Sequence, residues 1–364
     1  MVRWRSGTVQ AVRRRWRGAV ELDVTTDDGP LRALAYPGLV GEPEPGDRVL
    51  LNVGALVMGL GTGGYALVVA LPDRLPADPA DDGATRDAGH LVTARYTPLQ
   101  AILLGVDEEA SPHREVMAAA GSLDGMPVVT ADLHSALPAI LSGIDADRPD
   151  AGVAYVMTDG GALPAWFSRT LDGLRDHLAG TVTTGQAFGG DLEASTVHTG
   201  LLAARHVLGA DVAVVAQGPG NLGTGTTWGF SGVALGEAVN AIGTLGGRAV
   251  GSLRISDGDG RPRHRGISHH SLTAYGRVAL LPADLPLPDV LPAGLAAEVE
   301  AALAPLTARH RLVRVPVDGL DEALRASPVG LSTMGRGLDQ DHAYFLTAAA
   351  AGRHAATLLS RSRP

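Results

Sequence analysis

The chain has 364 residues, no cysteine and a formal net charge of −9, and its 30 basic residues are all arginine. This composition excludes disulfides, thiolate metal sites, Schiff-base lysines and the lysine of a P-loop. The negative charge and an aromatic content of only 4% argue against nucleic-acid binding. No uncharged apolar run approaches about 18 residues, so we expect a cytoplasmic protein without a membrane span.

Residues 1–72 are predicted to form a small antiparallel β-barrel. Short strand-like runs alternate there with turn signals such as Asp27-Asp28-Gly29, which is the pattern of a compact all-β unit. Residues 73–89 are rich in Pro, Asp, Ala and Gly and are predicted to be a linker. The predicted strands are 8–16, 19–25, 31–36, 48–53 and 65–71.

Residues 90–364 are predicted to form a Rossmann-like, mostly parallel, doubly wound α/β domain. Apolar runs alternate there with helical patterns, and ligands of such sheets bind beyond the carboxyl ends of the strands. The predicted strands are 127–130, 153–158, 180–184, 212–216, 249–256, 278–281 and 312–317. The predicted helices are 167–178, 192–208, 233–245, 295–307 and 341–359.

A glycine-rich loop follows the buried strand predicted at 212–216. Backbone N–H groups and hydroxyls of such a loop, placed before a helix, favour phosphate or another anion. The run also matches the dinucleotide fingerprint G-x-G-x-x-G, but the predicted helix opens about eight residues too late and the expected acidic residue is missing. We therefore predict an anion site rather than a nicotinamide site. Its predicted binding residues are Gly218, Gly220, Gly223, Thr224 and Gly225.

Polar residues follow the other predicted strands as well. Asp132 and His134 follow the first strand, Asp159 the second and Asp191 the third. His269 and His270 follow the strand predicted at 249–256. Since imidazole titrates near neutral pH, we predict one of these two histidines as the general acid or base. Asp159 or Asp191 is predicted to orient it or to hold Mg²⁺, with His134 as a further catalytic candidate.

Four arginines lie close to these histidines in the sequence. Arg263 and Arg265, with Arg336 near the C-terminus, are predicted to clamp the anion, because guanidinium groups match phosphate and carboxylate. A metal held by His264, His269 and His270, with Asp257 and Asp259, is the alternative. Because the arginines would repel a divalent cation, no metal ligand is assigned.

Several of these motifs, in this order, resemble the bacterial domain-of-unknown-function family 3866. They are Tyr96-Thr-Pro-Leu-Gln100, Thr158-Asp-Gly-Gly-Ala-Leu-Pro164, Phe188-Gly-Gly-Asp-Leu-Glu193, the glycine loop and Arg263-His-Arg-Gly-Ile-Ser-His-His270. The resemblance extends over nearly the whole chain. It implies no activity and no catalytic residue.

These observations favour an enzyme that acts on a small phosphorylated or otherwise anionic, nucleotide-like substrate. A non-catalytic ligand-binding regulator and a dinucleotide-dependent oxidoreductase remain as alternatives. A carboxylate within hydrogen-bonding distance of a histidine at the strand ends would favour the enzyme, since a ligand sensor has no need of that pair. The identity of the cofactor, with Mg²⁺ as one candidate, and homo-oligomer formation are left open.

Overall fold

A computed structural model describes residues 2–76 and 89–359 of the protein. The chain forms two compact units, Met1–Leu104 with Trp166–Asp172, and Gly105–Ala165 with Gly173–Pro364. Most of the predicted linker, residues 77–88, lies outside the described residues. The first unit also includes the short hairpin of β6 (Leu91–Thr93) and β7 (Ala101–Leu103).

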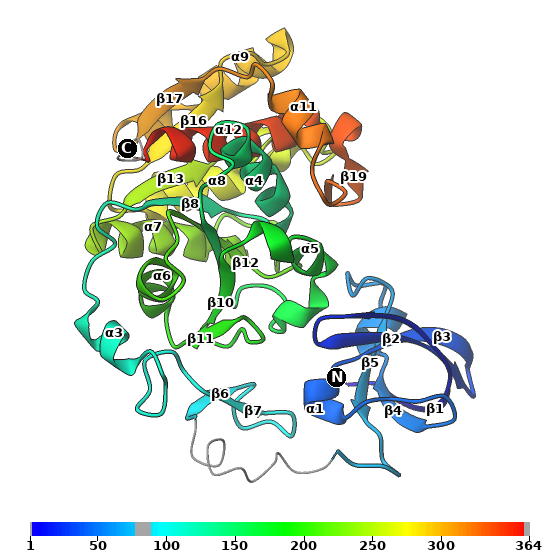
Figure 1. The fold of residues 1–364 in the computed structure, drawn as a ribbon. Coiled ribbons are helices and arrows are strands. Elements are labelled where there is room, and N and C mark those ends of the chain that lie inside the picture. Colours follow the sequence, from blue (N-terminus) through cyan, green and yellow to red (C-terminus); the bar gives the residue numbers. More distant parts are fainter. Residues whose placement is uncertain (1, 77–88, 360–364) are drawn as a thin grey trace. The chain divides into compact units, whose positions relative to one another are not determined.

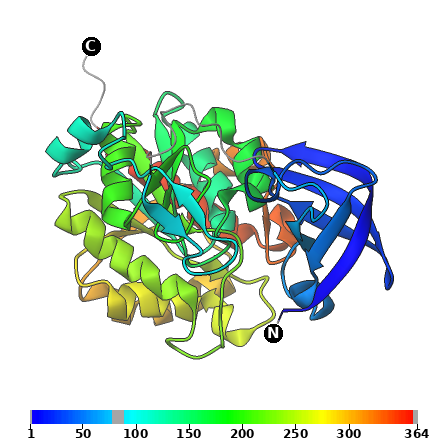
Figure 2. The ribbon, with the colours of Figure 1, turned by 90° about the horizontal axis from the view of Figure 1, so that it is seen from below.

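The first unit contains a closed five-stranded β-barrel, as predicted (Figures 1 and 2). Its strand order is β1-β2-β3-β5-β4, and β3 and β5 are its one parallel pair among the described strands. Leu22, Val49 and Leu51 are buried within this barrel, which explains the apolar residues of each predicted strand. The strands are β1 (Trp4–Trp16), β2 (Ala19–Thr26), β3 (Gly29–Ala35), β4 (Arg48–Asn52) and β5 (Ala66–Ala70).

The second unit is built on an eight-stranded sheet in which all strands are parallel. The strand order is β11-β10-β9-β12-β8-β13-β16-β17, which confirms the predicted Rossmann-like α/β architecture. The central strands are buried along their whole length, as expected for a parallel sheet covered on both faces. The strands are β8 (Pro127–Ala131), β9 (Val153–Thr158), β10 (Gly180–Thr184), β11 (Leu192–Ala194), β12 (Val212–Gln217), β13 (Arg248–Ser252), β16 (Asp284–Pro288) and β17 (Arg311–Val315).

Helices cover both faces of this sheet (Figure 1). The chain moves from β8 to β9 in one direction across the sheet and from β12 to β13 in the other. Right-handed crossovers therefore place the connecting helices α4 (Leu137–Asp145) and α7 (Ala234–Thr244) on opposite faces. Helix α12 (His342–Thr357) packs on α4, and α6 (Val197–His206) packs on α7.

The remaining helices are short. They are α1 (Pro37–Val40), α2 (Gly54–Val57), α3 (Arg114–Ala119), α5 (Arg169–Gly173), α8 (His269–Thr273), α9 (Ala293–Ala302), α10 (Ala304–Thr307) and α11 (Leu320–Arg325). Small two-stranded sheets pair β14 (Ile255–Ser256) with β15 (Gly266–Ile267) and β18 (Ser332–Thr333) with β19 (Arg336–Gly337). Within the described residues, none of the helices is both long and apolar enough to cross a membrane.

Several predicted elements differ from the structure. The helix predicted at 167–178 is only the short α5, with 3₁₀ turns before and after it. The strand predicted at 278–281 follows the π-helical stretch Ala274–Val278, and Leu280 is exposed, so this apolar run is not a sheet strand. The sheet strand is β16. It was not predicted as a strand because it contains prolines, which are rare inside sheets. The helix predicted at 192–208 begins only at Val197, because the Thr196 side chain accepts a hydrogen bond from Thr199 N and caps the helix there.

Candidate active site

The site lies where the connections of the sheet change direction. Strands β8 and β12 are neighbours, and the helices that follow them lie on opposite faces. A small pocket lies at the carboxyl ends of the two strands, lined by Asp132 and Gln217, at the usual ligand position of doubly wound sheets. Asp132 follows β8 directly and Gln217 ends β12, so both lie at this point.

Asp132 is the centre of the hydrogen bonds at this point. Its side chain is only 2% exposed, and its Oδ2 lies 2.9 Å from Nδ1 of His270. The amide of Asn221, from the glycine-rich loop, donates to Oδ1 over 3.1 Å. Burial alone would raise the pKa of Asp132, but the hydrogen bond with His270 and the charges of His270 and Arg254 hold that pKa below its ordinary value. Asp132 is therefore a buried carboxylate.

The ring of His270 is fixed on two sides. Asp132 bonds its Nδ1, and the ring of Phe230 stacks on it with the ring centroids 3.8 Å apart and the planes 1° from parallel. Asp132 itself can sit here only because residue 232 is glycine. A Cβ at Gly232 would lie 2.2 Å from Asp132 Oδ1. The pair is thus held in one orientation, which leaves Nε2 of His270 as the nitrogen that is available for chemistry.

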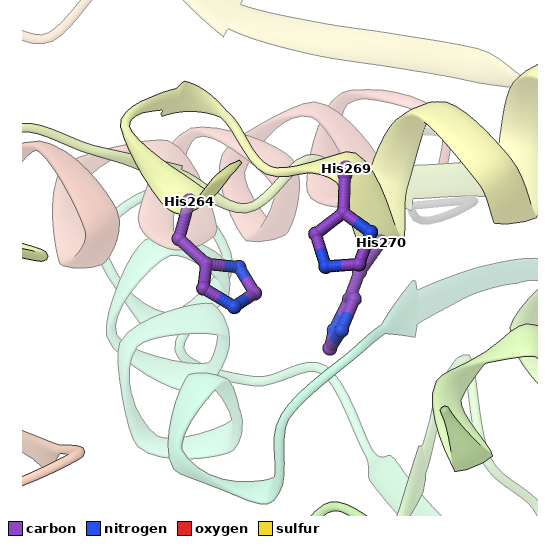
Figure 3. Close-up of side chains that lie close together, drawn as sticks. All are labelled: His264, His269 and His270. Atoms are coloured by element: carbon purple, nitrogen blue, oxygen red, sulfur yellow. The ribbon is translucent and has the colours of Figure 1, made fainter. Parts of the chain in front are cut away.

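Two further imidazoles lie beside His270 (Figure 3). His269 precedes it at the start of α8, and His264 comes from the loop before that helix. The ring centroids of the three histidines are 4.4 to 5.0 Å apart. One potential ligand nitrogen from each ring lies within 4.8 Å of the others. We refer to His264, His269 and His270 as the histidine cluster.

Ser268 explains why these rings meet. As N-cap of α8, its Oγ accepts a hydrogen bond from the backbone N–H of His270. The same Oγ lies 2.8 Å from Nδ1 of His264. One side chain therefore fixes the start of the helix and the orientation of the His264 ring. The buried Nε2 of His269 has no hydrogen-bond partner among the described residues.

Two histidines of the cluster are neutral at neutral pH. Burial, assisted by the charges of Arg254 and Arg261, lowers the pKa of His264 to about 3. Burial, assisted by the charges of His270 and Arg263, lowers the pKa of His269 to about 4. The pKa of His269 thus lies below the neutral range, because its charged form would lie in a poorly solvated and already positive place, and of the two predicted histidines His270 is the one bonded to a carboxylate.

A buried network of arginines and aspartates borders the cluster. The guanidinium of Arg254 lies 3.4 Å from Asp132 and 3.2 Å from Asp259. The hydrogen bond from Arg261 holds the pKa of Asp259 well below its usual range. Arg336 lies 2.8 Å from Asp341 and 3.4 Å from Asp259. Three guanidinium groups are thus matched by three carboxylates, those of Asp132, Asp259 and Asp341.

The three arginines predicted to clamp an anion differ in their surroundings. Arg336 is held by the two carboxylates of the network, and Arg265 bonds Glu298 over 3.0 Å. Arg263 is exposed, and its guanidinium carbon lies 3.6 Å from the position that a Cβ of Gly225 would occupy. Of the three, Arg263 is therefore the side chain that borders the glycine-rich loop without such a carboxylate pair in the described contacts.

The glycine-rich loop forms a hairpin. Gly223 bridges Phe230, and Thr224 N donates to Gly229 O over 2.7 Å. Gly218 N donates to Thr158 O, so two N–H groups expected to hold an anion are already used within the protein. Helix α7 begins only at Ala234 and not at Gly223. The loop therefore lacks the geometry of a dinucleotide fingerprint. Gly220 and Gly225 supply its two positive φ angles, +89° and +82°.

The other predicted catalytic residues form different contacts. Asp159 accepts a hydrogen bond from Gln186 N, and Asp191 accepts from the backbone and hydroxyl of Thr181. Neither is the carboxylate beside His270, which is Asp132. His134 is buried, with Nδ1 2.9 Å from the hydroxyl of Tyr155, and burial lowers its pKa to about 4. Its ring is thus neutral at neutral pH and bonded to a core tyrosine.

Sequence reasoning did not assign roles to Asp132, Asn221 and Phe230. Asp132 carries the same signal as Asp159, an aspartate directly after a buried strand. Only the strand order separates them, because Asp132 follows the strand next to β13, after which the histidines come. Asn221 lies within the glycine-rich loop, whose glycines predict binding by backbone N–H groups and not by a side chain.

Comparison with known proteins agrees with the motifs of the sequence. The model of the family described as protein of unknown function (DUF3866) matches residues 32–352. No curated protein matches the chain. The match includes β4 and β5 of the barrel, but not β1 and β2, and it includes every residue of the candidate active site. The chain therefore belongs to the DUF3866 family.

Proposed function

We propose that the protein is an enzyme that acts on a small anionic molecule at the carboxyl ends of β8 and β12. The observation that carries the proposal is the hydrogen bond between buried Asp132 and His270. Removing a charged carboxylate from water costs several kcal/mol unless charged and polar partners compensate. An enzyme uses such a pair to hold an imidazole in one tautomer and one orientation.

The anionic character of the substrate is supported by Arg263. This exposed guanidinium lies against Gly225, at the edge of the loop whose Asn221 reaches Asp132 and His270. A guanidinium in this position favours phosphate or carboxylate groups. The arginines of the buried network serve a different role, because Asp132, Asp259 and Asp341 already match their charge.

The glycine-rich loop and a test for chemical change distinguish the proposed enzyme from its two alternatives. A dinucleotide-dependent oxidoreductase needs a helix that opens at the third glycine of the fingerprint, and here Gly223 pairs with Phe230 instead. A ligand-binding regulator would bind the same anion and leave it chemically unchanged. We therefore base the test on chemical change and not on binding.

The test incubates the purified full chain with a small-molecule extract and follows by mass spectrometry which molecules disappear and which appear. We expect an anionic molecule to be consumed, and His270→Gln to slow this about 10²–10⁴-fold. His177→Gln is the matched control, because His177 is exposed and outside the site. Equal consumption by the His270 variant, or a molecule that binds without changing, would contradict the proposal.

A further inference from the structure

We infer that His264, His269 and His270 bind one divalent transition-metal ion of the zinc class. The three rings come from two segments, the loop that ends in His264 and the first residues of α8, and they surround one small space (Figure 3). One nitrogen of each lies within 4.8 Å of the other two. Zn–N bonds are about 2.0–2.1 Å long, so for all three nitrogens to bind one ion the rings of His264 and His269 have to rotate toward His270.

The hydrogen bonds of the rings identify the nitrogens. His270 uses Nδ1 for Asp132, and His264 uses Nδ1 for Ser268. Each therefore keeps Nε2 for an ion. A carboxylate or hydroxyl on the far nitrogen is the usual support of a metal-binding imidazole, because it fixes the tautomer and the orientation of the ring.

His269 supplies the third, independent observation. Its Nε2 is buried and has no hydrogen-bond partner among the described residues. A buried polar atom without a partner is rare in folded proteins and calls for a ligand or an unseen group. A metal ion in the space shared by the three rings would give this nitrogen a partner, which none of the described protein groups provides.

The arginines nearby do not prevent the binding of a cation. Arg254, Arg261 and Arg336 are each within hydrogen-bonding or ion-pair distance of an aspartate, and the three carboxylates balance their charge. The charges of these three arginines are thus largely compensated, while Arg263 remains without a carboxylate pair in the described contacts. Asp132, one of the three carboxylates, lies directly behind His270.

The ligand set selects the metal. Imidazole nitrogens favour Zn²⁺, Co²⁺, Ni²⁺ and similar ions, whereas Mg²⁺ prefers oxygen ligands. Three imidazoles leave at least one position of a tetrahedral ion open for water or for an oxygen of the substrate. The metal site itself stands on the geometry of the cluster. Only its link to catalysis rests on the proposed function.

The experiment uses the untagged full chain, stripped with a chelator and titrated with Zn²⁺ by calorimetry. We expect one Zn²⁺ per chain. His264→Gln, His269→Gln and His270→Gln should each weaken binding at least about 10-fold, and Asp132→Asn should weaken it about 10–100-fold with the stoichiometry unchanged. His177→Gln should bind as the wild type does. No binding, or binding that all four site variants leave unaltered, would overturn the inference.

Substitution with Co²⁺ guards against variants that fail to fold, since it uses the wild-type chain. Intense visible absorption from a four-coordinate ion, removed by adding Zn²⁺, is the expected result. The weak bands of a six-coordinate ion would contradict the tetrahedral geometry inferred for this site. Binding of Zn²⁺ without any turnover would overturn the proposed function and leave this inference intact. Turnover by fully metal-free protein would overturn only the link between the metal and catalysis.

Discussion

The glycine-rich loop and the histidine cluster lie at the same edge of the sheet but are built in opposite ways. Residues 222–228 of the loop are exposed, and several of their backbone groups bond to other groups of the same hairpin. The cluster is largely buried and is supported by Asp132, Ser268 and a network of paired charges. On the proposed function, the cluster would supply the chemistry and the loop would form the rim of the site.

The largest expected effect is a difference in stability between two variants, one without Asp132, which supports the histidine cluster, and one without the exposed Asp159. Asp132→Ala removes the carboxylate partner of His270 and one of the two carboxylate partners of Arg254, and should lower the free energy of unfolding by about 3–5 kcal/mol. Asp159→Ala, which removes one hydrogen bond to Gln186 N at an exposed position, should cost about 1 kcal/mol. Urea denaturation followed by circular dichroism measures both. Equal decreases in the free energy of unfolding would show that Asp132 contributes no more to stability than an exposed aspartate does.

A pair of glycine substitutions compares the two regions directly. Gly232→Ala places a Cβ 2.2 Å from Asp132 Oδ1 and should cost about 1–3 kcal/mol of stability. Gly223→Ala, in the loop, meets nothing closer than the Cβ of Phe230 at 3.8 Å and should be nearly neutral. The same denaturation assay measures the difference. If Gly223→Ala is the more damaging change, the loop is packed more tightly than its contacts indicate.

The stability of the folded protein should also depend on pH through the buried His134. The pKa of His134 is about 4 in the folded protein and about 6.5 when unfolded, so the unfolded state takes up the proton first as pH falls. Stability should therefore decrease from pH 7 toward pH 4, with about 1–2 kcal/mol from this residue by pH 5. His134→Gln should remove that share of the pH dependence, and the exposed His177→Gln should not. An unchanged slope in His134→Gln would place a charged His134 in the folded state.

The smallest expected effect concerns the rim. Phosphate or sulfate should raise the melting temperature, because a ligand that binds only the folded state stabilises it. Arg263→Ala should abolish this rise while changing the melting temperature without ligand very little, since the side chain is exposed. Arg265→Ala, which removes a partner of Glu298, is the control and should keep the rise. A rise that persists in Arg263→Ala would remove this residue from the anion site.

Much of the fold follows from local patterns. The barrel strands and the strands β8, β9, β10 and β12 are short apolar runs between turn signals, and such runs have few other ways to bury their side chains. Two sheet strands were missed, β11 inside a predicted helix and β16, and β16 carries Pro286 and Pro288, which local rules assign to edges or loops. Its place in the sheet depends on pairing with β17 along the strand, and not on its own composition.

The site was only partly predictable for the same reason. His269, His270 and Arg263 stand out as a basic run in an acidic chain. Asp132 and Asp159 each follow an apolar strand, and the sequence gives no order in which those strands pair. Long-range pairing places β8 next to β13, and this brings Asp132 to His270 across 138 positions of the chain.

The most direct test of the account compares two variants in the same turnover assay with the small-molecule extract. His270→Gln alters the buried cluster, and Thr224→Ala removes a hydroxyl that bonds only within the exposed loop in the described contacts. The account predicts that Thr224→Ala consumes the anionic substrate within about threefold of the wild-type rate, while His270→Gln is slower by about 10²-fold or more. A variant at Thr224 that is inactive beside a fully active His270→Gln would contradict it.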